Sequence, residues 1–170
     1  PVTADMETDY RLALERHVDA MGRVDYATWS ESKEDRRALE RYTGALLAAL
    51  DPSELADWLN LYNALVTREI VRRWPMESVR DVRTVGGAPA LFYDLQFDVA
   101  GDQLSLLDIE TQIIRLRFAD PRALFAISCG TRSCPLLPRV PYSRQALDRE
   151  LEQATRAFVN HPDNVSVSDE

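Results

Sequence analysis

The spacing of apolar side chains along the chain is mostly helical, with repeats of three to four residues. It predicts a first helix that Thr3 or Asp5 caps and that ends near Gly22. A second helix is predicted over residues 33–50, and a last one from a cap at Ser143 to about residue 159. Helices therefore make up most of the secondary structure that we expect.

The most apolar helix is expected in the middle of the sequence. Asp51-Pro52-Ser53-Glu54 is typical of a helix start, with a capping side chain, proline at the first helical position and a carboxylate near the positive end. The helix should run to about Arg73, and its apolar residues cover so much of its circumference that we expect it to be central and buried. Asn60 and Asn63 interrupt that surface. A buried amide needs hydrogen-bond partners, so these two either bind neighbouring backbone or line a site.

Strand-like patterns are short. Residues 91–99 alternate between apolar and polar, and Gly101-Asp102 can turn the chain into a hairpin that returns through residues 103–105. An apolar run predicts a buried strand over residues 124–128, and residues 164–168 alternate like a closing edge strand. The pattern predicts one mixed α/β (α+β) domain over residues 1–170, rich in helix, with a small, mainly antiparallel sheet.

A further helix is predicted between the hairpin and the second strand. Ser105 and Asp108 resemble a capping box, and the helix should continue to about residue 118. Its inner face is expected to consist of Leu106, Ile109, Ile113 and Leu116. Glu110 and Arg115 lie at the margin of that face, so each can point toward neighbouring elements.

Composition narrows the classes of function. At 170 residues and 45% hydrophobic, the chain can bury a core without a disulfide scaffold. The net charge of −8 argues against nucleic-acid binding, because neutralising phosphates requires a basic face. No apolar run is long enough to span a bilayer.

Four stretches of the sequence, in order, are similar to the family called domain of unknown function 547. They are Gly22-Arg23-Val24-Asp25-Tyr26; residues 58–65, Trp-Leu-Asn-Leu-Tyr-Asn-Ala-Leu; residues 104–110, Leu-Ser-Leu-Leu-Asp-Ile-Glu, with Ile114-Arg115; and residues 120–135, which contain Cys129 and Cys134. The resemblance implies no established activity. Relatives often have histidine where this chain has Thr111, and many continue into a further aromatic segment, so we expect that a C-terminal piece is missing.

The resemblance also implies an exported bacterial protein. The chain opens at Pro1 rather than at methionine, so we expect a processed or trimmed form, and removal of a leader is one way to produce it. We therefore expect an extracytoplasmic, periplasmic or secreted location, with a cytoplasmic one as the alternative. The oligomeric state is left open.

The residues around Cys129 and Cys134 are the strongest candidates for chemistry. A thiol-dependent enzyme would use Cys134 as its nucleophile, with Arg132 lowering the thiol pKa. Glu110 would be its catalytic partner, and it could orient substrate or water together with Asn60 or Asn63. The only histidines, His17 and His161, fall in no recognisable motif, so a Cys-His pair is unsupported; we expect His17 to be an ordinary helix histidine.

Three other interpretations compete with the enzyme. Cys129 and Cys134 can form a disulfide if their Cα atoms come within about 7 Å, or both can remain reduced thiols. A binding module would use Asn60, Asn63, Glu110 and Arg115, with the cysteine-bearing turn, as a polar pocket for a small molecule or peptide. In a structural role, the same residues would form a buried network with no pocket. Two cysteines alone do not make a four-ligand zinc site, so we predict no metal and no cofactor.

Overall fold

The structure is a computed structural model that describes residues 1–82, 90–131, 133–161 and 164 of the chain. Its elements run in the order α1 (Ala4–His17), α2 (Tyr26–Glu31), α3 (Lys33–Ala49), α4 (Leu55–Arg73), η1 (Val79–Asp81), α5 (Ala90–Tyr93), β1 (Phe97–Val99), β2 (Asp102–Leu104), α6 (Leu106–Asp108), η2 (Ile109–Arg117), η3 (Pro121–Phe125) and α7 (Leu147–Val159). The segments η1 and η3 are 3₁₀ turns, and η2 is a π-helix. The prediction of a helix-rich fold with a small antiparallel sheet is confirmed.

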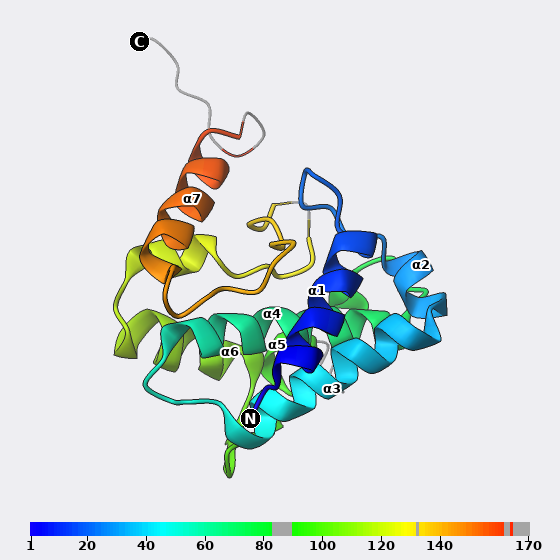
Figure 1. Ribbon diagram of the computed structural model, residues 1–170, viewed down its shortest axis with the longest axis horizontal. Helices are drawn as coiled ribbons and strands as arrows, with labels where there is room; N and C mark the ends of the chain where they lie inside the picture. Colours follow the sequence, from blue (N-terminus) through cyan, green and yellow to red (C-terminus); the bar gives the residue numbers. More distant parts are fainter. Residues whose placement is uncertain (83–89, 132, 162–163, 165–170) are drawn as a thin grey trace.

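Helix α4 lies at the centre of the fold, as its apolar circumference predicts. All its residues from Leu55 to Val71 except Asp57 are buried. It packs against α3 and against η2 (Figure 1). Helix α1 packs against α3, and η3 packs against both η2 and α7. Helix α4 is therefore the element around which the other helices pack.

Two of the predicted boundaries of α1 and α4 are wrong, and both errors come from aspartate turns. Thr3 caps α1 as predicted, but the helix ends at His17 because Val18 pairs with Val24 in an antiparallel bridge. Asp19 closes the turn between them by accepting from the amides of Met21 and Arg23. At α4, Asp51 accepts from the amide and hydroxyl of Ser53 instead of capping a helix, and α4 begins only at residue 55.

The strands are shorter than the alternation suggests. Residues 90–93 form α5, in which Leu91 is fully buried and Tyr93 is 51% exposed. Pairing is confined to β1 and β2, in the register Phe97↔Leu104. No strand forms over residues 124–128: residues 124 and 125 belong to η3, and Asn63 binds the Ala126 carbonyl and the Ser128 amide. The predicted edge strand over residues 164–168 lies largely outside the described residues.

The Ser105 capping box forms as predicted, but the helix that follows widens into a π-helix. Both reciprocal bonds between Ser105 and Asp108 are present. Because η2 takes more residues per turn, its buried positions become Ile109 and Ile114, five residues apart. Leu116, expected to face inward, is 72% exposed. The last helix, α7, begins at Leu147, after a turn at Ser143.

Candidate functional site

The two asparagines of α4 bind loop backbone at two points. Asn60 donates from Nδ2 to the Tyr142 carbonyl at 2.9 Å and accepts from the Tyr142 amide at 2.8 Å. Asn63 donates to the Ala126 carbonyl at 2.9 Å and accepts from the Ser128 amide at 2.8 Å. Both side chains are buried. Each therefore fixes the path of a segment that is far away in sequence, and the second of these segments leads directly into Cys129.

Glu110 and Arg115 lie elsewhere, on η2. The Tyr62 hydroxyl donates to Glu110 Oε2 at 3.1 Å. Burial and, next, the Glu110 charge raise the pKa of Tyr62, so its phenol stays protonated and remains a donor. Arg115 is exposed on the same segment. Arg132 lies outside the described residues.

Cys129 and Cys134 form a disulfide, with 5.8 Å between their Cα atoms, which confirms that alternative. Within the loop the Cys134 amide donates to the Thr131 carbonyl at 3.2 Å. The Thr131 hydroxyl lies 3.4 Å from Cys129 Sγ and 3.3 Å from Cys134 Sγ. In this form neither cysteine is a free nucleophile, and a single hydroxyl is within reach of both sulfurs.

The disulfide opens onto a pocket of about 520 Å³ between two loops. One wall comes from residues 21–26 of the N-terminal loop (residues 19–26), and another comes from the disulfide loop (residues 128–131 and 133–136). His161 and Asn164, which follow α7, also line the pocket. The described residues that line the pocket are Met21, Gly22, Arg23, Val24, Tyr26, Ser128, Gly130, Thr131, Cys134, Pro135, Leu136, His161 and Asn164. Among the described residues, the lining includes Cys134 but none of Asn60, Asn63, Glu110 or Arg115.

Two glycines allow these loops to approach the body of the protein closely. Gly22 has φ of 68°, and a side chain there would collide with Leu136 of the opposite loop. Gly130 has φ of 74°, and a side chain there would collide with Ile70 of α4. Both positions combine a left-handed backbone with a close contact, which only glycine meets without strain. Gly22 thus allows the N-terminal loop to pack closely against the disulfide loop, and Gly130 allows the disulfide loop to pack closely against α4.

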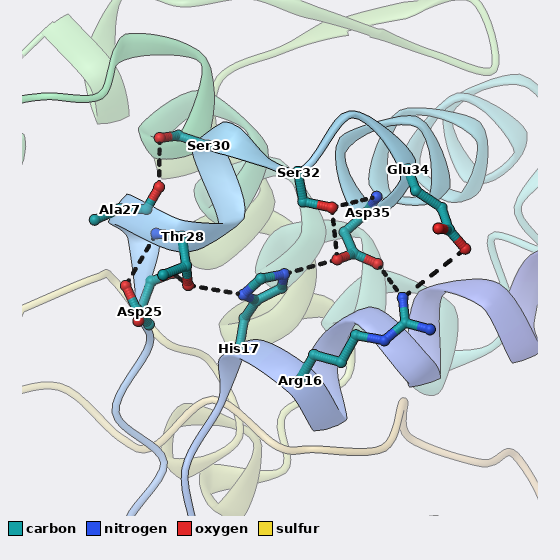
Figure 2. A network of polar contacts seen from close by, with 9 residues as sticks. All are labelled: Arg16, His17, Asp25, Ala27, Thr28, Ser30, Ser32, Glu34 and Asp35. Carbon is teal, nitrogen blue, oxygen red and sulfur yellow. Dashed lines mark hydrogen bonds and ion pairs between the residues drawn. The ribbon is translucent and has the colours of Figure 1, made fainter.

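A polar network joins α1, α2 and α3 next to the N-terminal loop (Figure 2). His17, the last residue of α1, contacts Asp35 of α3 through Nε2 at 2.9 Å and Thr28 of α2 through Nδ1 at 3.2 Å. Its carbonyl accepts from the Asp25 amide at 2.8 Å. Three helices are therefore joined at one buried imidazole, and the main chain of the same residue binds Asp25 of the N-terminal loop.

The network can satisfy the imidazole in either protonation state. The Asp35 carboxylate only accepts, so Nε2 carries a proton and Nδ1 of the neutral ring accepts from Thr28. In the cation, Nδ1 donates to Thr28 Oγ1, and the Thr28 proton can turn to the Asp25 carbonyl at 3.4 Å. Neither form of the ring leaves an unpaired ring nitrogen in this network.

Asp35 is kept ionised in this network. Burial alone would raise the pKa of its carboxyl, but hydrogen bonds from Ser32, His17 and Arg16 outweigh that effect and lower the pKa below its usual value. The Arg16 guanidinium lies 2.6 Å from Asp35 Oδ1. The buried carboxylate is thus paired and saturated with donors, which is typical of an anchor rather than of a catalytic base.

The lining of the pocket offers hydroxyl groups for hydrogen bonds, apolar surface and the Cys134 sulfur. Burial raises the pKa of Tyr26, which therefore offers a neutral hydroxyl. Met21 is 51% exposed and Leu136 is 37% exposed, so the rim presents apolar surface.

Among the described residues no group of histidine, cysteine and carboxylate side chains could hold a metal ion, and no helix is long and apolar enough to cross a membrane.

Sequence reasoning missed the N-terminal loop as one half of the pocket. Gly22 to Tyr26 is the first of the four family-like stretches, but the pattern alone does not show that it faces Cys134, more than 100 residues away. Gly22 itself, placed after the helical pattern, was the available signal for a special backbone position. The role of His17 was also missed, because its partners come from two other helices.

Comparisons with known proteins identify the family. No curated protein and no solved structure matches the chain. The sequence profile described as "Protein of unknown function, DUF547" matches residues 48–159, which is well over half of the chain and includes α4 and the disulfide loop. The N-terminal loop lies outside the match. On that match, the chain belongs to the DUF547 family.

Proposed function

We propose that the protein is a binding module that receives a short peptide segment in the pocket between the N-terminal loop and the disulfide loop. The observation that carries this proposal is the pocket itself, with its volume of about 520 Å³. That volume lies within the range of about 300 to 1,000 Å³ that is typical of ligand sites. Both walls are fixed from within, one by Asn63 and the other by the His17 network.

A peptide suits the lining better than a compact charged ligand. The rim offers two partly exposed apolar side chains, Met21 and Leu136, which can hold one apolar side chain of a ligand. The hydroxyls of Tyr26 and Thr131 are suited to bind its main chain. The Arg23 guanidinium donates to Asp19 at 2.7 Å, so its charge is already paired.

The disulfide also supports an extracytoplasmic location. Disulfides persist in oxidising compartments and are rare where glutathione and thioredoxin keep thiols reduced. Cys129 and Cys134 are both partly exposed rather than sealed in the core, so a reducing compartment would act on them. A periplasmic or secreted location is therefore proposed.

Selection of binders from a library of random peptides displayed on phage tests the proposed function. Peptides selected on the wild-type protein should lose at least about tenfold in affinity for Met21→Glu, because the rim loses its apolar contact. Leu116→Glu is the matched control, since Leu116 is 72% exposed on η2 and does not line the pocket. Peptides that bind all three proteins equally, or no enrichment at all, would contradict the proposal.

A further inference from the structure

We propose that Cys129–Cys134 is a reactive disulfide that exchanges with a pair of cysteines in the peptide bound in the pocket. This inference rests on the proposed function, because the exchange requires the peptide to be held beside the disulfide. The chemical class of the substrate is a peptide dithiol.

The position of the disulfide makes one sulfur the point of attack. Cys134 lines the pocket, whereas Cys129 is not among the lining residues. Both residues are partly exposed, unlike a disulfide sealed in a core. A peptide thiol in the pocket therefore meets Cys134 first, and Cys129 becomes the leaving group.

Thr131 is placed to stabilise the sulfur that leaves. Its hydroxyl lies 3.4 Å from Cys129 Sγ and 3.3 Å from Cys134 Sγ, so a small rotation directs its single proton to either sulfur. A hydrogen bond favours the charged thiolate and lowers the pKa of the thiol. A leaving thiol of lower pKa leaves faster in thiol–disulfide exchange.

The step balances without an external oxidant. A thiolate of the peptide attacks Cys134 Sγ, an S–S bond forms between them, and the Cys129–Cys134 bond breaks with its electron pair on Cys129. The second peptide thiol loses its proton to solvent and attacks the peptide sulfur of the mixed disulfide, which releases Cys134. The peptide has lost two electrons and two protons to become a disulfide, and the protein has gained them as two thiols.

The loop is held in place at both ends by bonds other than the disulfide. Before Cys129, the Ser128 amide donates to Asn63 of α4. After Cys134, Leu137 is buried in the core. The dithiol product therefore keeps the stem of the loop, and the reaction can run in both directions on a folded protein.

The rate of exchange with the reduced peptide acetyl-Leu-Cys-Gly-Gly-Cys-amide is the test, measured on the full chain by alkylation and mass spectrometry. We expect this peptide to be oxidised at least about tenfold faster by the protein than by oxidised glutathione at the same disulfide concentration. A rate equal to that of glutathione, or slower, would overturn the proposal.

Thr131→Val keeps the disulfide and removes only the hydroxyl. It should slow the exchange about tenfold, because a hydrogen bond to a charged sulfur is lost. Thr155→Val is the matched control, since the Thr155 hydroxyl binds the Leu151 carbonyl on α7; its rate should stay within about twofold of the wild type. Equal rates for both variants would contradict the role of Thr131.

The single-cysteine variants distinguish which sulfur is attacked. With the oxidised peptide, Cys129→Ser should be trapped as a mixed disulfide through Cys134 faster than Cys134→Ser is trapped through Cys129. The opposite order would refute the assignment. If phage-selected peptides bind the wild type more tightly than Met21→Glu while the disulfide stays inert to the dithiol peptide, the exchange proposal fails and the binding function stands. If no peptide binds, the binding function fails.

Discussion

The hydrogen bonds of Asn63 make the sharpest prediction about how the fold supports the pocket. Asn63→Ala removes the partner of the Ala126 carbonyl and of the Ser128 amide, both on buried residues. Leaving a buried polar group unpaired costs about 1 to 3 kcal/mol, so the two together should lower the free energy of unfolding by about 2 to 6 kcal/mol. Asn160→Ala, on an exposed residue at the end of α7, should change it by less than about 0.5 kcal/mol.

Asn63→Asp tests the two hydrogen bonds separately, because only the bond to the Ala126 carbonyl depends on the protonation of the new carboxyl. An ionised carboxylate can still accept from the Ser128 amide, but its second oxygen would face the Ala126 carbonyl, which only accepts. Protonation restores a donor, so the introduced carboxyl should have a folded-state pKa above its unfolded value of about 3.9. The loss of stability relative to wild type should therefore shrink as the pH falls through that raised pKa.

Urea unfolding of the three variants, followed by circular dichroism from neutral pH to pH 4, measures both effects. A cost below about 1 kcal/mol for Asn63→Ala would refute the reasoning, because it would mean that the loop backbone is not held by this side chain. A pH-independent cost for Asn63→Asp would show that the Ala126 carbonyl does not face position 63.

Three further changes probe the disulfide loop and its support. Gly130→Ala should cost about 2 kcal/mol or more in urea unfolding, because φ is 74° and the added methyl would meet Ile70; an unchanged midpoint would contradict this. The double replacement of Cys129 and Cys134 by serine should cost about 2 kcal/mol, the loop-closure entropy expected for a sequence separation of 5, and reduction of the wild type should cost the same. Asp35→Asn should lower the free energy of unfolding by about 1 to 3 kcal/mol at pH 7. This difference from wild type should become smaller when the pH is lowered below about 4, because the depressed pKa of Asp35 contributes stability only while the carboxyl is ionised. A difference that grows in acid would refute this.

The fold was predictable where the local signal and the packing agree. The apolar circumference of α4 required a central position, and the Ser105 capping box fixed a helix start. The errors arose where a side chain from a distant element changed the outcome. The apolar run over residues 124–128 predicts a strand, but its first two residues belong to η3 and Asn63 binds the Ala126 carbonyl and the Ser128 amide. The π-helical turn of η2 moves Leu116 outward.

The site was predictable in part. The cysteine-bearing stretch stood out, and its disulfide was one of the alternatives that the spacing allows. The constellation of Cys134 with Glu110 stays a hypothesis, whereas the pocket joins Cys134 to residues 21–26. No periodicity connects those two segments, because their contact depends on how α1 ends and on the missing side chain of Gly22.

The central claim is that the pocket between the two loops is where a peptide binds. Its most direct test is the change in backbone amide chemical shifts when a phage-selected peptide is added to the isotopically labelled wild-type protein. The shifts should be concentrated in residues 21–26, 128–131 and 133–136 and in His161 and Asn164, which lie around the pocket, and should be small on η2. Shifts concentrated on α3, α7 or η2, with residues 21–26 and 128–136 unchanged, would contradict the claim.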